Sequence, residues 1–265
     1  LSLPTPEIAD PRQSSPLTPP IATAPPSTPL ATPDPAQADL SDTPTDHRPQ
    51  VAIIIDDMGY NLDIGRQLLQ LDLALSFSFL PAAPHTPVLA QQALAGRRSI
   101  LVHLPMEPKE WRGIEEPQTL RLGESDEEIQ QTLAWMLAAV PAAIGANNHM
   151  GSRFTEDQRA MRQVLMRLRA GSLFFIDSFT SAASVGEATA QQLGLPTARR
   201  RIFLDNEQHS TSICRQLGAL VTRARAEGAA IAIGHPNAAM VEALRTCAGE
   251  QLASVQVVGV DRLVH

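Results

Sequence analysis

The fold class is decided by the stretch VAIIIDDMG at residues 51–59. Five apolar residues run without interruption up to Asp56 and Asp57. Such a run is typical of a strand buried on both faces, as the strands of a parallel sheet are. The two aspartates directly after it place titratable groups at the carboxyl end of this strand.

Similar apolar runs recur along the rest of the chain. They lie at residues 74–80, 99–103, 142–146, 173–176, 201–204, 229–233 and 255–258. Helix starts are predicted between them, at the capping box SDEE (125–128), at TEDQ (155–158), at SVGE (184–187) and at Asn237. Strands that alternate with helices predict an α/β fold.

Two α/β architectures fit this alternation, a (β/α) barrel and a doubly wound sheet. No strand is followed by either glycine-rich phosphate motif, GxGxxG or GxxxxGK[ST]. The absence of both motifs favours the barrel.

The first 50 residues differ in composition from the remainder. They hold 13 of the 22 prolines, no Phe, Trp or Tyr, and a net charge of −4. Such a segment has too little apolar surface to pack a core. We therefore expect residues 1–50 to be a disordered Pro/Thr-rich linker and residues 51–265 to be one folded domain.

Charge and cysteine content exclude several classes of protein. The net charge of −7 and the pI near 5.5 argue against nucleic-acid binding, which needs a basic face. No stretch approaches 18 consecutive apolar residues. The two cysteines, Cys214 and Cys247, form no CxxC motif and fit a reducing or an oxidising compartment. Because the chain starts at Leu1, we expect that a signal peptide or membrane anchor has been removed upstream.

Polar residues follow seven of the expected strands. They are Asp56-Asp57, Pro84-His85, His103, Asn147-Asn148-His149, Asp177-Ser178, Asp205-Asn206-Glu207 and His235-Pro236. In (β/α) barrels the active site is built at the carboxyl ends of the strands. Any one of these residues could be a helix cap, but their recurrence at seven strands predicts a site at this edge.

The residue types suggest a metal site. Asp57, His103 and His149 offer one carboxylate oxygen and two imidazole nitrogens. Three such ligands with an open fourth position are typical of catalytic zinc, which lowers the pKa of its water to about 7. Asp56 would be the general base and His235 would protonate a leaving group. The alternative for each histidine is an ordinary hydrogen-bonded residue of the rim.

Four segments together resemble the divergent polysaccharide deacetylase family. They are IIIDDMG (53–59), HLPMEP (103–108), NNHMGSRF (147–154) and IGHP (233–236). The resemblance covers residues 51–248 and implies a distorted (β/α) barrel of about seven strands, related to the chitin and peptidoglycan deacetylases. It also implies roles for four residues: Asp56 matches the catalytic base, Asp57 the metal-binding aspartate, His103 the first histidine of an HxxxH metal motif, and His235 the late histidine that assists the leaving group.

The sequence departs from the family pattern at two places. Glu107 stands where the second histidine of the metal motif would be, so either Glu107 or His149 is the third ligand. We favour His149, which keeps two nitrogens and one oxygen. The segment GSR, ending at Arg153, stands in place of the usual Arg-Pro-Pro motif. We expect Glu107, Arg153, Asp177 and Asp205 to contact the substrate.

The resemblance implies a metal-dependent hydrolase, with a divalent metal such as zinc, that removes acetyl groups from an N-acetylated glycan of the cell envelope. Tyr60 and Trp111 are candidates for stacking against sugar rings. We expect an extracytoplasmic, periplasmic location and a tether to a membrane through a segment absent from this chain. The alternatives are a non-catalytic envelope protein that binds a glycan, peptide or protein in the same pocket, and a metal phosphodiesterase or another hydrolase on the same scaffold.

The composition of the tail generates the first prediction. A chain that begins at Arg48 should melt at the same temperature as the full chain, because residues 1–50 lack the apolar periodicity needed to pack. Differential scanning calorimetry of both proteins is the measurement. A melting temperature several degrees lower in the shortened chain would show that the tail docks on the domain.

Overall fold

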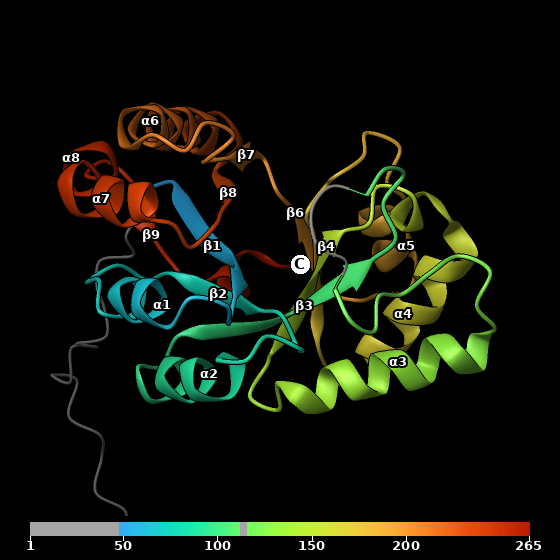
Figure 1. Cartoon of the computed structure of the whole chain (residues 1–265). Coiled ribbons are helices and arrows are strands. Elements are labelled where there is room, and N and C mark those ends of the chain that lie inside the picture. Colours follow the sequence, from blue (N-terminus) through green and yellow to red (C-terminus); the bar gives the residue numbers. More distant parts are fainter. Residues whose placement is uncertain (1–47, 112–115) are drawn as a thin grey trace, which may run out of the picture. The chain divides into compact units, whose positions relative to one another are not determined.

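Nine strands form one parallel sheet in the part of the chain that the computed structural model describes, residues 48–111 and 116–265 (Figure 1). The predictions for residues 1–47 fall outside the described residues. The strands are β1 (Gln50–Met58), β2 (Ser76–Phe79), β3 (Ser99–Met106), β4 (Gly145–Met150), β5 (Phe174–Asp177), β6 (Thr197–Arg199), β7 (Ile202–Phe203), β8 (Ala229–Gly234) and β9 (Gln256–Val257).

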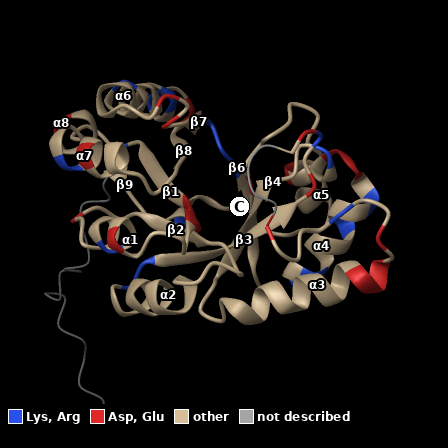
Figure 2. Cartoon of the chain, viewed as in Figure 1, with Lys and Arg blue, Asp and Glu red and all other residues tan. Residues whose placement is uncertain are grey.

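The sheet follows the circular order of a barrel that does not close. Its path is β6-β5-β4-β3-β2-β1-β8-β7, with β9 paired to β1 as well. β6 and β7 are consecutive in the chain, yet β6 pairs with β5 and β7 pairs with β8. The expected distorted barrel is therefore confirmed as a curled, open half-barrel. Its seam lies at the short link between β6 and β7, and three consecutive arginines, the last residue of β6 and the two residues of the link, stand there (blue in Figure 2).

Helices cover the outer face of the curled sheet (Figure 1). They are α1 (Leu62–Leu69), α2 (Thr86–Ala95), α3 (Asp126–Ala139), α4 (Gln158–Ala170), α5 (Gly186–Gln192), α6 (Ser210–Glu227), α7 (Ala238–Thr246) and α8 (Ala248–Gln251), with 3₁₀ turns η1 (Phe154–Glu156) and η2 (Val260–Leu263). Each helix follows a strand or another helix, as the alternating pattern of the sequence predicts.

The apolar run of β1 serves two cores. Val51, Ile53 and Ile55 pack toward the helices, whereas Ala52 and Ile54 belong to a second cluster inside the curl. All five residues are fully buried. Burying one isoleucine side chain stabilises a fold by roughly 1.5–3 kcal/mol, so both faces of this strand contribute to stability. Because both faces of β1 are buried along this run, its sequence is apolar at all five positions and does not alternate between apolar and polar residues.

Two of the predicted helix starts are confirmed in detail. Ser125 accepts a hydrogen bond from the amide of Glu128, and the Glu128 carboxylate accepts one from the amide of Ser125, at 3.2 and 2.8 Å. Asn237 caps α7 by accepting from the Met240 amide. These pairs satisfy amides that the first turn of a helix leaves without a partner.

The prediction that Thr155 caps α4 is wrong by two residues. Asp157 is the cap, and its carboxylate accepts a hydrogen bond from the Ala160 amide at 2.8 Å. Thr155 lies in η1, where its hydroxyl donates to the carbonyl of Gly151. The strand predicted at 201–204 is confirmed only as the two-residue β7, and β6 just before it was not predicted.

A disulfide joins Cys214 of α6 to Cys247, the residue between α7 and α8. The sequence left the state of these two thiols open. Stable disulfides are typical of proteins outside the cytoplasm, so this bond favours an extracytoplasmic location. Within residues 48–111 and 116–265, no helix combines the length and the apolar character needed to cross a bilayer.

The disulfide generates the second prediction. The double variant Cys214→Ser, Cys247→Ser should lose about 3–4 kcal/mol of unfolding free energy, because the bond closes a loop of 33 residues in the unfolded chain. For a domain of this size the melting temperature should fall by roughly 7–15 °C. Thermal unfolding with and without a reducing agent is the measurement. An equally large effect of the reducing agent on the double variant would contradict this assignment.

Candidate metal centre

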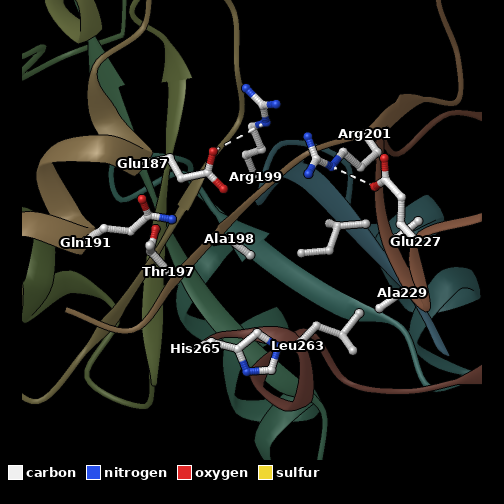
Figure 3. Close-up of a pocket in the computed structure, with 12 residues that line it drawn as sticks. Glu187, Gln191, Thr197, Ala198, Arg199, Arg201, Glu227, Ala229, Leu263 and His265 are labelled. Carbon is white, nitrogen blue, oxygen red and sulfur yellow. Dashed lines mark ion pairs between the residues drawn. The ribbon is translucent and has the colours of Figure 1, made fainter. Parts of the chain in front are cut away.

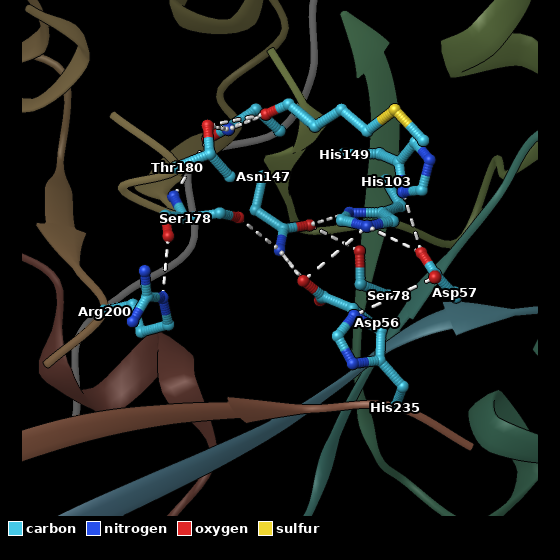
Figure 4. Close-up of polar contacts among 12 residues, drawn as sticks. Asp56, Asp57, Ser78, His103, Asn147, His149, Ser178, Thr180, Arg200 and His235 are labelled. Carbon is cyan, nitrogen blue, oxygen red and sulfur yellow. Dashed lines mark hydrogen bonds and ion pairs between the residues drawn. The ribbon is translucent and has the colours of Figure 1, made fainter. Parts of the chain in front are cut away.

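A left-handed turn at the end of β1 brings two carboxylates to one place. Asp57 has φ 52°, and the pairing of β1 with β2 shifts register between Ile55 and Met58. Side chains of adjacent strand residues otherwise point to opposite faces. Here Asp57 Oδ1 lies 3.1 Å and Asp56 Oδ2 3.6 Å from the same atom, Nε2 of His103 (Figure 4).

Gly59 allows this turn to pack against the start of α2. Its φ is +125°, a backbone conformation that other residues rarely adopt. A Cβ atom at this position would lie 2.3 Å from Oγ1 of Thr86 and 2.6 Å from Cβ of Ala83. The Asp-Asp-Met-Gly segment is therefore held by close contact with α2 as well as by the sheet.

Asp57, His103 and His149 bring three ligand atoms together. The atoms lie within 4.8 Å of one another. Oδ1 of Asp57 is 2.8 Å from Nδ1 of His149 and 3.1 Å from Nε2 of His103. One carboxylate oxygen and two imidazole nitrogens suit a divalent transition metal. The predicted triad can therefore hold such an ion, whose identity the residues leave open.

Glu107 is engaged elsewhere. Its Oε2 accepts a hydrogen bond from the Leu122 amide at 2.7 Å, and its Oε1 pairs with the Arg153 guanidinium at 2.9 Å. Of the two candidates for the third ligand, the geometry favours His149. Glu107 and Arg153 tie together the segments that follow β3 and β4, and their contact with a substrate stays a prediction.

The electrostatics of the two aspartates differ. Burial raises the pKa of Asp57, but hydrogen bonds from His103 and His149 outweigh it and hold that pKa well below its usual range. Burial dominates at Asp56, so its pKa is raised, although His103 and His235 partly offset the effect. Asp57 is thus a ready anionic ligand, and Asp56 has a greater affinity for a proton.

His235 faces the same centre from the end of β8. Nδ1 of its ring lies 3.1 Å from Oδ1 of Asp205, and its Nε2 lies 3.8 Å from Oδ2 of Asp57. Oδ2 of Asp205 also accepts hydrogen bonds from the backbone amide of His235 and from the Asn237 side chain. Burial lowers the pKa of His235, but the Asp205 hydrogen bond and the Asp57 charge outweigh it and raise the pKa to about 9.

Asp177 is directed toward the loop that leads into α5. Its Oδ1 accepts from the Phe179 amide, and its Oδ2 accepts from the Ser184 hydroxyl and the Glu187 amide. Asp205, by contrast, lies beside His235, as described above. Direct contact of either aspartate with a substrate stays a prediction.

The sequence indicates Asn147 only as one of the polar residues at the strand ends, and its central role in the site was not predicted. Its Nδ2 donates to both oxygens of Asp56 at 2.8 and 3.1 Å and to Oγ of Ser178 at 3.1 Å. Its Oδ1 accepts from Nδ1 of His103 at 2.9 Å and from the Ser78 hydroxyl. A signal was available, because Asn147 stands two residues before a predicted ligand and alternate strand residues share a face.

A cavity of about 510 Å³ lies at the seam of the sheet, away from this centre (Figure 3). β6, β8, α5, the end of α6 and the last residues of the chain line it. Two ion pairs flank it, Glu187–Arg199 at 3.4 Å and Arg201–Glu227 at 3.2 Å. Its lining includes none of the predicted catalytic or metal-binding residues.

Comparison with known proteins agrees with the motifs. Residues 53–264 match the family model described as divergent polysaccharide deacetylase. The uncharacterized protein YibQ of Escherichia coli (strain K12) is 36% identical over 196 residues, which are 74% of this chain and 61% of that protein. The chain therefore spans less than two thirds of that relative's length.

Two solved structures share the fold. An uncharacterized protein of Agrobacterium tumefaciens C58 superposes with a TM-score of 0.77 at 25% identity, over 82% of this chain and 89% of that one. The chitin deacetylase of the fungal pathogen Colletotrichum lindemuthianum superposes with a TM-score of 0.53 at 12% identity, over 81% and 87%. The second likeness shows a common fold and nothing further.

The ligand geometry generates the third prediction. The protein should bind one divalent transition ion per chain, and His149→Ala should weaken binding more than about 100-fold with little loss of stability, because the ligand lies at a strand end. Glu107→Ala is the control, since Glu107 is engaged with Leu122 and Arg153. Elemental analysis and zinc titration calorimetry measure both. Loss of binding in Glu107→Ala but not in His149→Ala would contradict the ligand set.

Proposed function

The chain belongs to the divergent polysaccharide deacetylase family, and we propose that it is a metal-dependent hydrolase that removes acetyl groups from an N-acetylated glycan of the cell envelope. One observation carries this proposal. Two adjacent carboxylates reach the same imidazole, one of them within the ligand set and the other beside it. A protein that only bound a glycan would have no need of the second carboxylate.

In this proposal Asp57, His103 and His149 would hold a zinc ion, which would supply Lewis acidity toward the acetamide carbonyl. Residues of the chain perform the proton transfers. Asp56 accepts a proton from the water that attacks the carbonyl carbon. Two observations support the role of Asp56 as general base. Its carboxylate lies beside the ligands, and burial at the end of β1 raises its pKa.

His235 completes the reaction as the general acid. When the bond between the carbonyl carbon and nitrogen breaks, Nε2 of His235 gives a proton to the departing amine, and the products are acetate and a free amino sugar. A pKa of about 9 keeps the ring protonated at neutral pH. Asp205 positions the ring by accepting from Nδ1, so that Nε2 faces the carboxylates.

The rim of the site offers surfaces for a sugar. Tyr60 is half exposed and follows the Asp-Asp-Met-Gly turn, and its hydroxyl donates to the Glu116 carboxylate at 2.9 and 3.0 Å. Trp111 is also exposed, with the Arg121 guanidinium 5.2 Å from its ring. Aromatic faces of this kind suit stacking against pyranose rings. The disulfide supports action outside the cytoplasm, and we propose the periplasm.

The role of Asp56 generates the fourth prediction. Asp56→Asn keeps the size of the side chain but removes its ability to accept a proton, so turnover should fall about 100-fold or more while the metal stays bound. The assay measures acetate released from N-acetylglucosamine oligomers and from peptidoglycan fragments.

The control for that experiment is Asp261→Asn. Asp261 accepts a hydrogen bond from Ser99 at the amino end of β3, at the opposite edge of the sheet, so its replacement should leave turnover unchanged. Equal turnover in Asp56→Asn and the wild type would exclude Asp56 as the base. A metal-loaded wild-type protein that releases no acetate from any substrate would contradict the hydrolase and favour a binding protein.

A further inference from the structure

We propose that Asn147 is the positioning residue of this centre, and that its carboxamide performs two separable tasks. The oxygen fixes the metal ligand His103, and the nitrogen fixes the general base Asp56. The task at Asp56 rests on the proposed hydrolase, whereas the task at His103 requires only that the site binds a metal.

The oxygen side determines which nitrogen of His103 faces the ligands. An amide oxygen only accepts hydrogen bonds, so Nδ1, 2.9 Å away, carries the hydrogen of the imidazole ring. When a metal replaces the proton between His103 and Asp57, the lone pair is then on Nε2, the atom that lies 3.1 Å from Oδ1 of Asp57. The Ser78 hydroxyl donates to the same amide oxygen. A partner at the second nitrogen of a ligating histidine orients the ring and raises its basicity.

The nitrogen side holds the base. Nδ2 of Asn147 donates to the two oxygens of Asp56 and to the Ser178 hydroxyl. Rotation of the carboxamide by 180° would turn its oxygen toward the Asp56 carboxylate and its NH₂ group toward the N–H of His103. Both contacts would be repulsive, so only one orientation is stable. Asn147 is fully buried, so water does not readily replace a lost partner.

The sheet itself brings these groups to Asn147. Five neighbouring strands each contribute one member, with Asp56 from β1, Ser78 from β2, His103 from β3, Asn147 from β4 and Ser178 directly after β5. His103 and Asn147 are direct partners in the pairing of β3 with β4. Because of this register, the side chain of Asn147 can reach both the ligand His103 and the base Asp56 (Figure 4).

Two substitutions in the full chain separate the two tasks. Asn147→Asp keeps an oxygen for His103 and Ser78 but places a second oxygen against Asp56. It should keep zinc affinity within about threefold of the wild type, or bind more tightly, and lose roughly 100-fold in turnover at saturating zinc. Asn147→Leu has a side chain of similar volume but can form neither hydrogen bond. This variant should lose turnover and also about 10- to 100-fold in zinc affinity.

Asn148 provides matched controls. It is also buried, but its side chain contacts the Met150 carbonyl, the Thr180 hydroxyl and the Ser178 amide, and none of the predicted ligands. Asn148→Asp and Asn148→Leu make the same chemical changes one residue along the chain. They should lower the melting temperature by about as much as the corresponding Asn147 variants do. Their zinc affinity, measured by competition with a chelator, should change less than about threefold.

A direct measurement on the wild type covers the case in which Asn147→Leu does not fold. Long-range ¹H–¹⁵N spectra of the zinc-loaded protein should assign the ring hydrogen of His103 to Nδ1. A hydrogen on Nε2, wild-type zinc affinity in folded Asn147→Leu, or equal losses in the Asn148 variants would overturn the task at His103. Wild-type turnover in Asn147→Asp would overturn the task at Asp56. Absence of turnover in the wild type would contradict the hydrolase instead, and the zinc affinities and spectra would still decide the role of Asn147.

Discussion

The site depends on the left-handed turn at the end of β1. β1 lies in the sheet between β2 and β8, and its apolar residues pack on both faces, so the strand itself cannot shift. The positive φ of Asp57 then sends two successive carboxylates toward the same imidazole. Such a conformation costs of order 1–3 kcal/mol and persists where the surrounding structure holds it. Contact of the Gly59 segment with α2 provides that support.

Burial of charge explains the polar residues around this turn. Asp56 and His103 are each only 2% exposed, and a buried charge is costly unless it has partners. Asn147 provides hydrogen bonds to both, and Ser78 and Ser178 complete the partners of its own amide group. Asp205 does the same for His235. The network therefore stabilises the fold. It also fixes the orientations of the side chains that would bind a metal and a water molecule.

The open seam and the disulfide lie at other parts of the same domain. The sheet ends at β6 and β7, where the chain crosses from one edge to the other within two residues, Arg200 and Arg201. Arg200 bonds to the carbonyls of Ser178 and Phe179, which connects the seam to the loop after β5. The disulfide fastens α6 to the segment after α7 on the outer layer. The contacts of Arg200, whose backbone amide also donates to the carbonyl of Asp177, hold the end of β5.

The sequence by itself determined the α/β class, most strands with apolar runs, the capping box at Ser125 and the residues at the strand ends that come together as the triad. These features are local, because propensity, periodicity and capping depend on residues a few positions apart. Only the tertiary structure decided the open seam, the pairing of Cys214 with Cys247, the engagement of Glu107 with Arg153 and the central place of Asn147. Each of these depends on the register of strands or helices that are distant in the chain, and the register of one strand against another is set by packing of the whole sheet.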